Sequence, residues 1–210
     1  MKLLIIGSTG RTGKELIKQG LAQGHYITAL ARKPAKIKIK NKNLKIVKGN
    51  VLKLETLEKA FENQDVILSA LGHKRLIIKT NILSEGTKNI ITAMKKNGIK
   101  RLICITSLGI NDSRFKLGLY YTFFVIPFII AFYFHDKSKQ EKLIMQSNLE
   151  WTIIRPGMLT NGRLTKKYQH GAGLGSYFMT KMISRANLAH FMLDQVADNT
   201  YLDKITGITN

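Results

Sequence analysis

The stretch KLLIIGSTGRTG, residues 2–13, decides the fold class of this chain. Its apolar residues 3–6 are typical of a buried strand, and Gly7, Gly10 and Gly13 follow with the spacing G-x-x-G-x-x-G. In such a loop the first glycine permits a tight turn, the second lets the backbone approach a pyrophosphate, and the third lets a helix pack on the strand. The stretch therefore predicts a strand, a glycine turn and a helix whose N-terminus binds the phosphates of a dinucleotide.

The rest of the chain repeats this alternation of strand and helix. We expect apolar strands at 26–31, 44–47, 66–71, 101–106 and 151–155, helices at 54–61, 80–96, 136–147 and 186–196, a loop at 161–176 and an edge strand at 204–208. Apolar strands separated by amphipathic helices indicate a parallel sheet covered on both faces. The predicted fold is α/β, a Rossmann-type doubly wound parallel sheet, in one domain covering residues 1–210. Substrate-pocket segments are expected at about 108–135 and 156–185.

The charge and cysteine content of the chain bear on its possible partners, metal sites and location. Subtracting 13 Asp and Glu from 34 Lys and Arg gives a net charge of +21, which raises nucleic acid and anionic membranes as partners. The lysines are spread along the whole chain, so nucleic acid is the less favoured partner. The single cysteine, Cys104, lies in an apolar run and excludes a disulfide or a cysteine-based metal site, and no metal is predicted. No signal-peptide pattern follows Met1, so a cytoplasmic location is expected.

The end of the second strand bears on the choice of cofactor. NAD binding usually places an acidic residue there to accept hydrogen bonds from the ribose 2′-hydroxyl, but this chain has Arg32 and Lys33, with Lys36 close by in the sequence. A guanidinium suits a 2′-phosphate, so NADP(H) is favoured, with NAD(H) as the alternative. Asn50, beside Val51, is either an adenine contact or a plain turn residue. Gly72, after the fourth strand, lets the cofactor pass close to the backbone.

Five motifs carry a resemblance to a known family. They are GSTGRTG at 7–13, LSEGTKNI at 83–90, TS at 106–107, WTIIRPG at 151–157 and HFML at 190–193. With these motifs the chain resembles the atypical short-chain dehydrogenases/reductases of the NAD(P)H-binding, NmrA-like group, and within it the biliverdin reductase B (flavin reductase) branch. That branch has a Pro-His pair where this chain has Pro156 and Gly157. The resemblance therefore implies an NAD(P)H-dependent oxidoreductase but does not transfer a bilin substrate.

The resemblance also assigns residues to the cofactor. It implies that Thr9, Gly10, Arg11 and Thr12 line the phosphates and that Arg32 reads the 2′-phosphate. Leu71 and Gly72 would flank the nicotinamide ribose. Thr106 and Ser107, at the end of the fifth strand, would lie beside the nicotinamide, and Pro156 and Gly157 would close over its reactive face.

Reduction of a carbonyl also needs a proton donor. In the superfamily this donor is a tyrosine one helical turn before a lysine, and Tyr133 and Lys137 have that spacing. The candidate catalytic residues are thus Ser107, Tyr133 and Lys137. A packing role for Tyr133 remains open in so aromatic a segment. A flavin or quinone acceptor can take its proton from solvent and needs no tyrosine.

Residues 117–134 contain no charged residue and many aromatic ones, which brings the segment to the lower length limit of a membrane span. A span here would interrupt the sheet between two strands, so we expect a pocket wall or lid, a homodimer surface, a peripheral membrane contact or simple core packing. The predicted function is NADPH-dependent reduction of a flat or apolar small molecule, such as a flavin, quinone or carbonyl compound. The alternative is a non-catalytic NAD(P)-sensing or scaffolding protein of the NmrA type.

Overall fold

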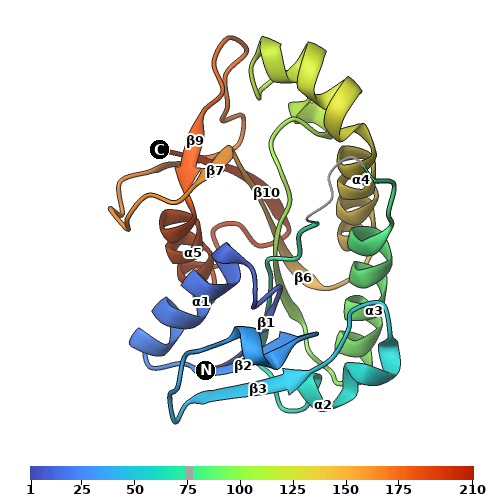
Figure 1. The fold of residues 1–210 in the computed structure, drawn as a ribbon, viewed down its shortest axis with the longest axis vertical. Helices are drawn as coiled ribbons and strands as arrows, with labels where there is room; N and C mark the ends of the chain where they lie inside the picture. Colours follow the sequence, from blue (N-terminus) through green and yellow to red (C-terminus); the bar gives the residue numbers. More distant parts are fainter. Residues whose placement is uncertain (74–77) are drawn as a thin grey trace.

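A computed structural model describes residues 1–73 and 78–210 and contains one large sheet (Figure 1). Its strands are β1 (Lys2–Ile6), β2 (Tyr26–Ala31), β3 (Leu44–Lys48), β4 (Val66–Ser69), β5 (Arg101–Ile105), β6 (Glu150–Pro156), β8 (Gln169–Gly171) and β10 (Lys204–Thr209). They lie in the order β3-β2-β1-β4-β5-β6-β10-β8. Neighbouring strands are parallel, except that β8 runs antiparallel to β10.

Helices cover both faces of the sheet (Figure 1). One face carries α1 (Arg11–Ala22) and α5 (Arg185–Asp194), and the other carries α2 (Glu58–Phe61), α3 (Ile82–Lys96) and α4 (Ala131–Met145). Side chains of β1 alternate between the two layers: Leu3 and Ile5 pack in the core beside α1 and α5, whereas Leu4 and Ile6 pack in the core beside α2, α3 and α4. The predicted doubly wound α/β fold is confirmed.

The direction of winding reverses at β1. The chain places β2 and β3 on one side of β1, and then returns to place β4, β5 and β6 on the other side. In open α/β sheets, ligands bind outside the carboxyl ends of the strands at such a switch point. The fold therefore locates a binding crevice between the ends of β1 and β4.

The expected strands are present, and the expected helix at 54–61 is divided into a 3₁₀ turn at 54–56 and α2. Two further differences lie near the C-terminus. Residues 204–208 are not an edge strand, because β8 pairs with β10 and takes the edge position. The predicted loop at 161–176 contains that strand, whose residues 169–171 are polar and glycine-rich and give no strand pattern in the sequence. Short elements complete the fold: β7 (Met158–Thr160), β9 (Met182–Ser184), and the helical turns η1 (Pro34–Lys36), η2 (Leu54–Thr56) and η3 (Asn111–Ser113).

The aromatic stretch at 117–134 forms a π-helix, η4 (Tyr121–Ile130), that continues directly into α4. Helix α4 thus begins at Ala131, five residues before the predicted start at 136. Within residues 1–73 and 78–210, no helix combines the length and the apolarity needed to cross a membrane.

Candidate cofactor-binding site

A cleft of about 660 Å³ opens at the switch point. Its walls come from the carboxyl ends of β1, β2, β4 and β5, from the start of α1, from Tyr133 and Lys137 of α4, and from Arg185 of α5. Most of the residues predicted to contact a cofactor line it: Gly7, Thr9, Gly10, Arg11, Thr12, Gly13, Arg32, Val51, Leu71, Gly72 and Thr106. Segments far apart in the sequence therefore meet in one cavity of the size expected for a ligand.

The glycine turn is packed so tightly that side chains do not fit. Gly7 has φ of +79°, and a Cβ atom on it would lie 2.3 Å from the carbonyl oxygen of Ala70. A Cβ on Gly13 would lie 2.3 Å from the carbonyl oxygen of Gly7. Both glycines are needed to hold the start of α1 against the ends of β1 and β4.

The start of α1 offers hydrogen-bond donors to an anion. Gly10 is the N-cap, and among the described residues no side chain caps the helix. The first amides of a helix have no partner within it, so the amides of residues 11–13 suit the oxygens of a pyrophosphate. All three of these residues line the cleft. The site thus fits the phosphates of a dinucleotide.

The cleft is also electropositive. Arg11, Arg32, Lys137 and Arg185 line it, and none of the described residues in its walls is Asp or Glu. Burial and the nearby charge of Arg11 lower the pKa of Arg185. Two guanidinium groups close enough to repel would both be stabilised by an anion bound between them. Arg185 has no distinguishing sequence pattern, because it reaches the cleft only through the packing of α5 beside α1.

Tyr133 and Lys137 lie together in the cleft wall, as their spacing on one helix predicts. The Lys137 side chain is buried, and its Nζ donates a hydrogen bond of 3.2 Å to the carbonyl oxygen of Ile105. Its Nζ also lies 5.4 Å from the centroid of the Tyr133 ring. The half-buried Tyr133 is thus held beside a fixed positive charge at the carboxyl end of β5.

The neighbouring Asp136 fixes α4 in this position. Its carboxylate accepts hydrogen bonds from the amides of Leu83 (2.9 Å) and Ser84 (3.1 Å) and from the Ser84 hydroxyl. These amides belong to the first turn of α3, so Asp136 caps that helix from a different element. The cap ties α3 to α4 and thereby sets the orientation of Tyr133 and Lys137.

A sequence profile of the NAD(P)H-binding family matches residues 7–199, which is most of the chain. The chain belongs to this NAD(P)H-binding family. This result confirms the resemblance stated from the motifs, and the reductases among the relatives below agree with the expected class of NAD(P)H-dependent oxidoreductases.

Two curated relatives are similar to this chain in sequence, and one solved structure is similar to it in fold. The photosystem II assembly factor Ycf39 of Synechocystis is 27% identical over 96% of this chain and 61% of its own length. The divinyl chlorophyllide a 8-vinyl-reductase of Arabidopsis thaliana is 26% identical over 99% of this chain and 53% of its own length. This NAD(P)H-binding chain thus spans only about half to three fifths of these relatives. A short-chain dehydrogenase/reductase of Veillonella parvula in complex with NADP superposes with a TM-score of 0.81, at 19% identity, over 100% of this chain and 94% of that one.

Five of the predicted site residues lie outside the cleft walls of this NAD(P)H-binding protein. The Ser107 hydroxyl donates to the carbonyl oxygen of Leu108 (2.8 Å). Asn50 stabilises its own turn, because its side-chain oxygen accepts from the amide of Leu52. The other three are Lys36, exposed in η1, Pro156, buried at the end of β6, and Gly157, packed against the backbone of residue 181.

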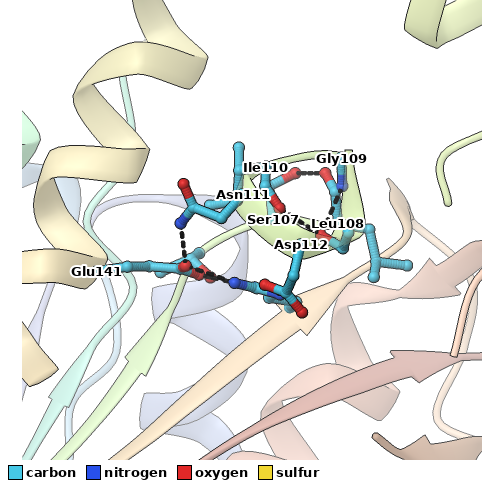
Figure 2. Close-up of polar contacts among 10 residues, drawn as sticks. Ser107, Leu108, Gly109, Ile110, Asn111, Asp112 and Glu141 are labelled. Atoms are coloured by element: carbon cyan, nitrogen blue, oxygen red, sulfur yellow. Dashed lines mark hydrogen bonds and ion pairs between the residues drawn. The ribbon is translucent and has the colours of Figure 1, made fainter. Parts of the chain in front are cut away.

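Figure 2 shows the polar contacts of the loop that carries Ser107, residues 107–112, together with Glu141. The loop after β5 is fastened by a buried ion pair in which Arg155 Nη2 lies 2.7 Å from Glu141 Oε2 and Arg155 Nε donates to Glu141 Oε1 (2.9 Å). Glu141 also accepts from Thr106 Oγ1 (2.6 Å) and from Asn111 Nδ2 (2.7 Å). Arg155 Nη1 pairs with Asp112 (2.7 Å). Burial opposes the charge of Arg155, but hydrogen bonds and charge from Glu141 and Asp112 outweigh it and raise the pKa of Arg155.

The LSEGTKNI motif is explained by packing. Ser84 bonds Asp136, and Gly86 lies so close to Val51 that a Cβ would come within 2.9 Å of the valine side chain. Asn89 donates to the carbonyl oxygen of Val51 (2.8 Å). The motif therefore holds α3 against α4 and the loop after β3, and it acts on the cleft through Val51, which lines it.

Proposed function

We propose that this chain is an oxidoreductase that uses NADPH to reduce a flat or apolar acceptor, such as a flavin, a quinone or a carbonyl compound. The observation that carries the proposal is a single cleft lined by two kinds of residue. One set is the glycine turn, the free helix amides and the arginines, which suit a phosphorylated dinucleotide. The other set is Leu71, Ile82, Leu159 and Tyr133, which suit an apolar ring.

The residues of the cleft support a division of labour. The amides of residues 11–13 would hold the pyrophosphate, and Arg32 at the end of β2 would hold the 2′-phosphate of NADPH. Arg11 and Arg185 add positive charge at the same end. When bound, the cofactor supplies a hydride. None of the described residues in the cleft walls is acidic, so the walls offer no carboxylate to accept hydrogen bonds from the free 2′-hydroxyl of NADH.

The proton for a carbonyl acceptor would come from Tyr133. Tyr133 lines the cleft, and Lys137 beside it is held by a hydrogen bond to the carbonyl oxygen of Ile105. Ser107 is the weaker candidate for contact with the acceptor, because its hydroxyl is already engaged with Leu108. For a flavin or quinone, solvent would supply the proton and Tyr133 would act as a wall.

A second candidate function is NAD(P) sensing or scaffolding without turnover. It is favoured by the relative from Synechocystis, whose name describes an assembly factor, and by the engagement of Ser107 away from the cleft. This function requires the same dinucleotide site but no acceptor. Only turnover distinguishes it from the first.

The experiment is calorimetric titration with NADPH and NADH, followed by measurement of NADPH oxidation with a panel of flavins, quinones and carbonyl compounds. We expect binding of NADPH and oxidation with at least one acceptor, lost or reduced in Tyr133→Phe only when the acceptor is a carbonyl compound. The control is Tyr26→Phe. Tyr26 is exposed and begins β2, so it lies at the amino ends of the strands, away from the cleft at their carboxyl ends. Binding without oxidation by any acceptor would support the sensor, and absence of binding would overturn both functions.

A further inference from the structure

Two segments outside the cleft expose an unusual number of large apolar side chains. Phe128 in η4 is 80% exposed and Phe178, in the loop before β9, is 81% exposed. The same segments expose further apolar side chains: Tyr120, Phe123, Phe124, Ile129, Phe132, Tyr177, Met179 and Met182. We call these ten residues the aromatic surface. Contiguous exposed apolar surface of this kind marks a site of interaction.

The two segments form one surface because their bases are joined. The amide of Gly118 donates to the carbonyl oxygen of Ser176 (2.9 Å), and the amide of Ser176 donates to the carbonyl oxygen of Lys116 (2.9 Å). Thr180 Oγ1 donates to the carbonyl oxygen of Leu117 (2.9 Å). Figure 1 shows the π-helix and the loop before β9 at the same end of the molecule, at the top of the view.

The charge around the aromatic surface has one sign. The sequence has no Asp or Glu from 113 to 135 or from 151 to 193, whereas Arg114, Lys116 and Lys181 lie within or beside the two segments. The nearest acid, Asp112, is paired with Arg155. Arg114 lies with its guanidinium carbon 5.9 Å from the centroid of the Phe115 ring. Aromatic side chains bordered by cations are typical of proteins that rest on an anionic membrane surface.

We propose that the aromatic surface docks on the interface of an anionic phospholipid bilayer, with Phe124, Phe128 and Phe178 entering the headgroup region. A second copy of the chain fits less well. In a symmetric dimer each surface would meet itself, so the cations around one surface would face those of the other. This proposal does not depend on the reaction proposed above, because none of the ten residues lines the cleft.

Docking would orient the cleft. The aromatic surface follows the carboxyl ends of β5 and β6, since η4 comes after β5 and the amide of Met158, just after β6, donates to the carbonyl oxygen of Lys181 (2.9 Å). The cleft opens at that same edge of the sheet. A docked molecule would therefore turn this edge toward the lipid.

The test is sedimentation of the full chain with vesicles of phosphatidylcholine alone or with about 30% phosphatidylglycerol. We expect binding to the anionic vesicles that weakens with salt. The triple variant Phe124→Ser/Phe128→Ser/Phe178→Ser should lower the partition coefficient by about tenfold or more. The variant Arg114→Gln/Lys116→Gln/Lys181→Gln should also lower it by about tenfold or more, on anionic vesicles only.

Matched controls separate the surface from general exposure. Phe128→Ser should weaken vesicle binding, whereas Tyr26→Ser, which removes an aromatic ring 58% exposed at the opposite edge, should not. The circular dichroism spectrum and the thermal unfolding midpoint of the triple variant report whether the chain remains folded. Failure of wild type to bind anionic vesicles, or equal binding by the triple variant, would overturn the proposal. A wild-type dimer in sedimentation velocity that becomes a monomer in the triple variant would also overturn it, because the surface would then be a self-interface.

Discussion

We propose the turn after β1 as the cofactor side of the cleft, and the end of β5 at Thr106, with the loop that follows it, as the acceptor side. These two sides are built by different means. On the cofactor side, the turn after β1 is held by backbone packing, with Gly7 and Gly13 in positions that no side chain can share. On the acceptor side, the loop after β5 is held by long side chains, chiefly the buried pair of Glu141 and Arg155. Backbone packing gives a short local pattern in the sequence, whereas an ion pair between α4 and β6 gives none. The turn after β1 could therefore be predicted from the sequence, whereas the conformation of the loop after β5 could not.

The largest expected effect comes from Gly7→Ala, which breaks the cofactor side. The new methyl group would meet the carbonyl oxygen of Ala70, so we expect a loss of more than about 3 kcal/mol of unfolding free energy and no NADPH binding. Gly24→Ala is the matched control. Gly24 has the same φ of +79° but nothing within 4 Å of the added Cβ, so it should cost only about 1 kcal/mol and leave binding intact. Chemical denaturation and calorimetry measure both. Equal effects of the two substitutions would contradict the packing argument.

Glu141→Gln removes a charge that holds the loop after β5. It leaves Arg155 without its buried counter-charge, and the expected cost is about 3 kcal/mol of unfolding free energy. Binding of NADPH should persist in the folded fraction, because Glu141 does not line the cleft. The control is Glu58→Gln, which removes an exposed ion pair with Lys96 and should leave stability nearly unchanged. If Glu141→Gln removed cofactor binding from folded protein, the two sides would not be independent.

Arg32→Ala tests whether the cofactor side distinguishes NADPH from NADH. Loss of a charge-assisted contact should weaken NADPH binding by about tenfold to a hundredfold and leave NADH binding nearly unchanged. Lys36→Ala is the control, since Lys36 is exposed and lies outside the cleft walls. Titration calorimetry with each nucleotide gives the ratio of affinities. If Arg32→Ala lowered the affinities for NADPH and NADH equally, Arg32 would not be the residue that binds the 2′-phosphate.

The smallest expected effect comes from Cys104→Ala. Cys104 is buried in β5, one residue before Ile105. Burial raises the pKa of this thiol from the ordinary value of 9.0 to about 11, partly offset by the charge of Lys137. A pKa raised in the folded state contributes stability that is complete below pH 9 and is lost as the pH rises toward 11. Cys104→Ala should remove this component from the stability profile between pH 9 and 11. An unchanged profile would show that the thiol does not contribute.

The same contrast explains what sequence could predict. The strand β1, the glycine turn and the apolar strands at the centre follow from local patterns, and so does the pairing of Tyr133 with Lys137 on one helix face. Arg185 could not be found, because its place in the cleft depends on how α5 packs beside α1. The direction of the Ser107 hydroxyl could not be predicted either, because the loop conformation depends on Glu141 and Arg155, which are distant in sequence.

We propose that the cleft at the β1–β4 switch point binds NADPH, and titration calorimetry of the folded wild-type chain with NADPH tests this most directly. We expect one binding site per chain, with weaker binding of NADH and no binding by the Gly7→Ala variant. Folded wild-type protein that gives no binding heat with either nucleotide, over a range of temperatures, would contradict it.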